Sequence, residues 1–227
     1  MHTLDKKACV SRILAVYGRA LPNEKAEGLV WYDLANTFCQ GLAKKYKLSV
    51  DQAAGITAAL SPQVSWKENQ RLAETMAKTG KCGALGNNER KARAIRNFRP
   101  VLETLTTETS PHTGQKVRAF YACIADPANA TAVCVDRHAF AILLGNLDAK
   151  VADLQPLERR GVYEQAEACY QEAARLLGTK PWQVQATTWV VWRNLKQSLQ
   201  IPLFGGLGHD ADWSEGFAAD AAKAVKN

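Results

Sequence analysis

Apolar residues recur every three or four positions along most of the chain, which is the spacing of amphipathic helices. The spacing is clearest over 8–17, 32–46, 163–177 and 183–197. Pro22 and Asn23 interrupt the pattern between the first two of these segments. No stretch alternates apolar and polar residues for long enough to build a sheet, so the chain is predicted to be all-α.

Capping and breaking residues set the expected ends of the helices between these segments. Ser49 begins one helix, and Pro62 ends or turns it. The next helix is expected over about 67–78, where Gly80 stops it. Asn87 or Asn88 is expected to cap a basic helix that runs to about residue 96. A short helix over 100–106, a turn over 110–114 and a further helix to about residue 124 complete this region.

Composition limits the class of protein. The chain has 227 residues, of which 47% are hydrophobic and 22% charged, as in ordinary globular domains and unlike disordered or collagen-like chains. The apolar runs 53–60 and 139–144 are far too short to span a bilayer. The N-terminus does not resemble a signal peptide. We therefore expect a cytoplasmic protein of one or two domains, with no membrane partner.

The six cysteines show no CxxC spacing, and the four histidines form no HExxH pair. Free buried thiols are therefore expected, with no metal site and no cofactor.

Positive charge is concentrated in one window. The formal net charge is +7, and residues 63–118 alone contain eleven basic and five acidic residues, a net of +6. This pattern favours a polyanionic partner, although a solvated helix face would look the same.

Two short segments have residues suited to chemistry on such a partner. The turn that ends at Gly114 precedes Lys116, so the first N–H groups of the following helix could bind a phosphate. A plain corner between two helices is the alternative interpretation. Asp136 precedes an apolar helical run and is a favoured N-cap residue, worth about 1 kcal/mol. A cap and a catalytic carboxylate are compatible roles. His138 is expected to be a packed structural residue.

These segments together resemble the helix-hairpin-helix DNA glycosylase superfamily, which includes endonuclease III and 8-oxoguanine glycosylase. Residues 111–119 (PHTGQKVRA) are similar to its Leu-Pro-Gly-Val-Gly-x-Lys-x-Ala hairpin, and residues 135–138 (VDRH) match its Val-Asp-x-His signature. Residues 60–63 (LSPQ) and 86–94 resemble two upstream segments. The resemblance covers about residues 48–145. His112 stands where the family has a hairpin glycine, and no four-cysteine loop follows, so no iron–sulfur cluster is expected.

The resemblance implies a two-lobed, all-α fold with a DNA cleft between the lobes. Residues 48–125 would form a helical barrel lobe that contains the hairpin. Residues 1–47 and 126–227 would form the second lobe, which carries Asp136. A monomer that binds double-stranded DNA is expected.

The resemblance also assigns roles to residues. Asp136 would stabilise an oxocarbenium-like transition state while a flipped base is excised. Lys116 would be the amine that forms a Schiff base in an AP-lyase step; a phosphate contact is its alternative role. Gln63 would fill the gap left by the base, unless it caps the next helix, and Trp66 would be a wedge or stacking platform. Further DNA contacts are expected from Arg90, Lys91, Arg93, His112, Thr113, Gly114 and Gln115.

Two other functions stay open on this sequence. Some phage-encoded relatives of this superfamily modify a 5-hydroxymethyl pyrimidine by displacing pyrophosphate, without loss of the base. A non-catalytic DNA-binding module would need the hairpin and the basic window alone. Trp189 and Trp192 lie in an apolar helical segment and are expected in the core rather than against a base.

Overall fold

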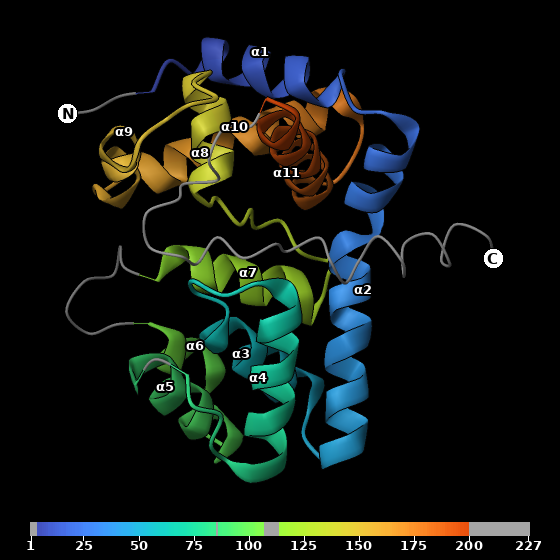
Figure 1. Ribbon diagram of the computed structural model, residues 1–227, viewed down its shortest axis with the longest axis vertical. Coiled ribbons are helices and arrows are strands. Elements are labelled where there is room, and N and C mark those ends of the chain that lie inside the picture. Colours follow the sequence, from blue (N-terminus) through green and yellow to red (C-terminus); the bar gives the residue numbers. More distant parts are fainter. Residues whose placement is uncertain (1–3, 85, 107–113, 200–227) are drawn as a thin grey trace. The chain divides into compact units, whose positions relative to one another are not determined.

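The computed structural model describes residues 4–84, 86–106 and 114–199 (Figure 1). These residues form eleven α-helices and one short 3-10 helix and contain no strand, so the all-α prediction is confirmed. Contacts divide the chain into two compact units. The described part of unit 1 is 4–31 and 131–199, and that of unit 2 lies within 32–130. No helix of the described residues is both long enough and apolar enough to cross a bilayer.

Unit 1 is a cluster of helices from both ends of the chain. It consists of α1 (Lys6–Tyr17), the first part of α2 (Pro22–Tyr46), α8 (Arg137–Leu144), α9 (Val151–Leu154), η1 (Gln155–Glu158), α10 (Val162–Leu177) and α11 (Pro181–Ser198). Helix α1 packs against α8, α10 and α11 (Figure 1). Ile13, Phe140 and Tyr170 are fully buried in this core, and the Tyr170 hydroxyl donates to the Ala139 carbonyl at 3.1 Å. The short elements α9 and η1 were not predicted.

Helix α2 begins at Pro22, ten residues before the predicted start. Proline is well suited to the first turn of a helix because its missing N–H would have no intrahelical partner there. The Glu24 carboxylate also accepts the Leu21 N–H at 2.8 Å. The same residue that was expected to separate two helices therefore begins the second one.

Gly28 marks a close approach between α2 and α11 within unit 1. A Cβ at this position would lie 2.6 Å from the Thr187 backbone nitrogen and closer still to the Thr187 Cα. Nearby, Gln183 donates to the Leu29 carbonyl at 3.1 Å. A glycine is therefore needed for the two helix backbones to meet here.

Unit 2 is built around α3 (Val50–Leu60). This helix packs against α4 (Trp66–Thr79), α5 (Gly86–Arg96), α6 (Val101–Leu105) and α7 (Gln115–Ala125) (Figure 1). Every residue of α3 from Gln52 to Leu60 is buried, which explains why its sequence is apolar on all sides. The later part of α2 completes the unit.

The predicted ends of these helices are confirmed at two positions and wrong at a third. Ser49 forms a capping box with Gln52, with both hydrogen bonds at 3.0 Å. Gly80 ends α4 in the left-handed conformation, at φ +78°. Helix α5 begins at Gly86, however, so Asn87 and Asn88 lie inside its first turn, and neither is its N-cap.

Candidate functional site

The Asp136 carboxylate is held at the N-terminus of α8. Its backbone is extended, and Oδ1 accepts the Ala139 N–H at 2.7 Å, so the predicted N-cap is confirmed. The segment before it is fixed through Tyr163 on α10, whose hydroxyl donates to the Val133 carbonyl at 2.8 Å and accepts the Val135 N–H at 3.1 Å. These contacts hold the backbone before Asp136 in place and so fix the direction in which its side chain projects.

The second carboxylate oxygen has its own donor. Asp136 Oδ2 accepts the indole N–H of Trp189, from α11, at 3.0 Å. Asp136 itself is half-buried. A carboxylate held at both oxygens by donors from two helices is oriented before any ligand arrives, and its partial exposure leaves it accessible.

Trp189 contacts a cation and an imidazole. The Arg193 guanidinium is 4.4 Å from the centroid of its ring, a cation–π contact, and Arg193 is only 4% exposed. The His138 ring meets Trp189 edge to face, with centroids 6.3 Å apart. His138 is buried as predicted. The indole that orients Asp136 is thus itself fixed by packing.

Lys116 lies in unit 2, in the first turn of α7, and is half-buried. Gly114 precedes this helix at φ +84°, and a Cβ there would come 3.1 Å from the Leu105 carbonyl oxygen. The turn therefore requires glycine, as the sequence indicated. The predicted contacts His112 and Thr113 lie outside the described residues, whereas Gln115 is the first residue of α7.

Positive groups gather where α6 ends and α7 begins. The Lys91 ammonium, from α5, donates to the Leu105 carbonyl at 3.4 Å, and Arg118 Nη1 lies 3.5 Å from where a Cβ at Gly114 would be. Burial lowers the pKa of Lys91, and the charges of Arg118 and Arg90 lower it further. Cations that repel one another in this way favour a bound anion.

Gln63 occupies the turn between α3 and α4. It is exposed and adopts a left-handed backbone, at φ +64°. The N-cap of α4 is Ser65, whose hydroxyl accepts the Glu68 N–H at 3.1 Å, so the capping role considered for Gln63 is wrong. A strained, exposed amide is the kind of residue that functional turns retain.

The structure corrects one predicted DNA contact, leaves a second exposed and qualifies a third. Trp66 is 1% exposed and packs edge to face on Phe38, so it is a core residue and no stacking platform. Arg90 is exposed on α5. Arg93 is half-buried, forms an ion pair with Glu89 and donates to the Gly80 carbonyl at 2.9 Å.

The contact between Trp189 and Asp136 was missed by the sequence analysis. Trp189 is buried, as predicted for a core residue, but its polar role depends on a partner 53 positions away. The spacing of Trp189 and Arg193, four residues apart on one helix face, was the available local signal of a cation–π pair.

Comparison with known proteins places the chain in a family. The model of the family of unknown function DUF7178 matches residues 1–196, and the chain belongs to that family. Comparisons with curated proteins and with solved structures found no match.

Proposed function

We propose that this member of the DUF7178 family is a DNA glycosylase with AP-lyase activity. The observation that carries the proposal is the Asp136 carboxylate, which is held by the Ala139 N–H and the Trp189 indole and is still partly exposed. The resemblance of residues 48–145 to helix-hairpin-helix glycosylases and the cations around the start of α7 support it.

Asp136 would act during cleavage of the bond between C1′ and the base. As that bond lengthens, its electron pair leaves with the base, and positive charge develops on the sugar ring. A fixed carboxylate next to C1′ stabilises this charge without having to reorient. Trp189 and the first turn of α8 supply that fixed orientation, because each holds a different carboxylate oxygen.

Lys116 would supply the amine for the lyase step. Its neutral ε-nitrogen attacks C1′, forms a Schiff base after the ring opens, and so permits β-elimination of the 3′ phosphate. Its place in the first turn of α7, directly after the Gly114 turn, is the place of the lysine in the hairpin that it resembles.

The DNA contacts in this proposal come from the turn at Gln63, from cations on α5 and from the start of α7. Gln63 fills the gap left by the flipped base, and Arg90, Lys91, Gly114 and Gln115 hold the phosphate backbone. The proposal includes a monomer that binds double-stranded DNA.

The test is borohydride trapping with purified protein and duplexes that contain an abasic site, an oxidised base or 5-hydroxymethyluracil. We expect a covalent adduct that is lost in Lys116→Ala and retained in Lys67→Ala, a control at an exposed lysine on α4. Release of the free base should be lost in Asp136→Asn, whose side chain can still cap α8.

Base release without an adduct would identify a glycosylase that lacks lyase activity and would return Lys116 to a phosphate contact. DNA binding without base release from any duplex would refute the proposed function. A thermal unfolding curve for Asp136→Asn that matches the wild type would show that loss of activity is not loss of folding.

A further inference from the structure

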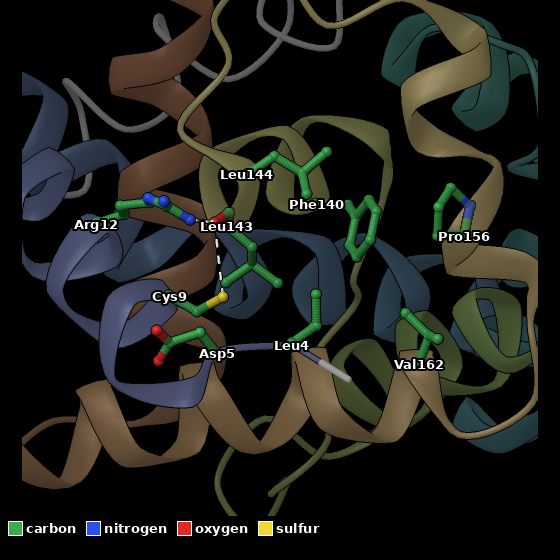
Figure 2. A pocket seen from close by; sticks show the side chains of 9 residues that line it. All are labelled: Leu4, Asp5, Cys9, Arg12, Phe140, Leu143, Leu144, Pro156 and Val162. Carbon is green, nitrogen blue, oxygen red and sulfur yellow. Dashed lines mark hydrogen bonds between the residues drawn. The ribbon is translucent and has the colours of Figure 1, made fainter. Parts of the chain in front are cut away.

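A pocket of about 250 Å³ opens in unit 1, next to α1, α8 and the start of α10 (Figure 2). Its walls are largely apolar and include Phe140, Leu143 and Val162. Cys9 and Arg12, one turn apart on α1, add a thiol and a guanidinium to this lining. No residue of the proposed DNA site lies in it.

The thiol and the guanidinium meet at one carbonyl. Arg12 Nη1 donates to the Leu143 carbonyl at 2.6 Å, and the Cys9 thiol donates to the same oxygen at 3.6 Å (Figure 2). Helix α1 also packs on α10, where the Cys169 thiol lies close enough to interact with Cys9. Cys9 and Cys169 are 2% and 1% exposed. Two thiols from packed helices therefore meet beside a pocket, and one of them lines it.

This arrangement activates one thiol of the pair. The neighbouring Cys169 thiol lowers the pKa of Cys9 and burial opposes this, while the Arg12 charge lowers the pKa further and the Asp5 charge raises it. At Cys39, burial outweighs the other contributions and raises the pKa to about 12. Because the thiolate is the nucleophilic form, and because Cys9 rather than Cys169 lines the pocket beside Arg12, Cys9 is the reactive member of the pair.

We propose that Cys9 is an oxidation site for hydroperoxides that enter this pocket, and that Cys169 resolves it to a disulfide between α1 and α10. The proposal is independent of any activity on DNA. It depends on the pocket, on the adjacent thiols and on the guanidinium beside them.

The chemistry takes two steps. The Cys9 thiolate attacks one peroxide oxygen, the O–O bond breaks, and the hydroxide that leaves takes up a proton to become water. Cys9 is then a sulfenic acid. The Cys169 sulfur attacks Cys9 Sγ, the S–O bond breaks, and the departing hydroxide takes the Cys169 proton as a second water. Two thiols are oxidised by two electrons, and one hydrogen peroxide is reduced to two waters.

The remaining cysteines offer an internal comparison. Among the described residues, no other cysteine lines this pocket. Cys39, Cys123 and Cys134 are buried. Cys82 is more exposed, but burial raises its pKa. A reaction governed by exposure would select Cys82, whereas the proposed reaction selects Cys9.

The experiment treats the full-length wild-type protein with hydrogen peroxide at neutral pH, blocks free thiols at intervals and maps peptides by mass spectrometry without reduction. We expect Cys9 to be consumed first and a Cys9–Cys169 linked peptide to appear. In Cys169→Ser the reaction should stop at a sulfenic acid on Cys9 that dimedone traps. Arg12→Gln should slow the reaction, and the control Cys82→Ser should leave it unchanged.

The pH dependence gives a second readout that needs no variant. Oxidation of wild-type Cys9 should be faster at pH 8 than at pH 6, because the fraction of the nucleophilic thiolate rises with pH. Earlier oxidation of Cys82, or a linked peptide that joins other cysteines, would overturn the proposal. So would a Cys9 rate that does not change over this pH range.

Discussion

Gly28→Ala should destabilise the protein although alanine is the better helix former. The substitution places a methyl group 2.6 Å from the Thr187 backbone nitrogen, where non-bonded carbon contacts normally lie at about 3.5–4.0 Å. The obstacle is the α11 backbone, so no change of rotamer can remove it. Helices α2 and α11 must move apart within unit 1.

The expected loss follows from two opposing effects. Overpacking costs about 1–3 kcal/mol, and a backbone obstacle belongs at the upper end of that range. Replacing glycine by alanine inside a helix returns about 1 kcal/mol. The net loss is therefore about 2 kcal/mol of unfolding free energy. For a chain of this size, that lowers Tm by roughly 4–8 °C.

Gly41→Ala is the matched control because it lies in the same helix with nothing within 4 Å of a new Cβ. It should raise stability by about 0.5–1 kcal/mol. Thermal and urea unfolding followed by circular dichroism would measure both variants. If Gly28→Ala leaves the midpoint unchanged or raises it, as Gly41→Ala should, the inference of a close helix contact at Gly28 is refuted.

Three further substitutions have expected outcomes. Ser49→Ala removes the capping box with Gln52 and should cost about 1 kcal/mol in a urea unfolding experiment; an unchanged midpoint would contradict the cap. Phe98 is 79% exposed and has a left-handed backbone, at φ +66°. A Cβ is unfavourable in this conformation, so Phe98→Gly should raise the unfolding free energy by about 1 kcal/mol. A lower urea midpoint would show instead that the Phe98 side chain packs on the protein. Trp189→Phe removes one hydrogen-bond donor to Asp136. If the proposed function holds, this variant should lower kcat about tenfold and leave KM unchanged. Equal changes in kcat and KM would argue against a positioning role for Trp189.

Much of the fold could be predicted because helix signals are local. The capping box at Ser49, the left-handed Gly80 and the apolar periodicity of α10 each depend on residues within a few positions of one another. The start of α2 was placed wrongly because Pro22 and Asn23 were taken to separate two helices, whereas Pro22 begins the second one. The need for Gly28 in this helix was not predictable, because it depends on Thr187, far away in sequence.

In the candidate site, too, contacts between residues close in sequence could be predicted and contacts between distant residues could not. Asp136 as an N-cap was predictable because its partner, Ala139, is three residues away. Its second donor, Trp189, was not, because the contact depends on how α8 and α11 pack. Trp66 was wrongly predicted to contact DNA. The sequence of a helix start does not show whether an aromatic side chain faces solvent or, as here, packs on Phe38.

Because unit 1 contains segments from both ends of the chain, it can be completed only late in synthesis. The described part of unit 2 lies within one continuous stretch of the chain. Helix α1 of unit 1, by contrast, packs on α8, α10 and α11, and α11 ends at Ser198. At about 5–20 residues per second, roughly six to twenty-four seconds separate the emergence of α1 from that of α8, the first of these partners to be made. During that interval the buried face of α1, with Val10, Ile13 and Val16, has none of its partners α8, α10 and α11. The nascent chain must therefore carry an exposed hydrophobic helix, an early binding site for chaperones.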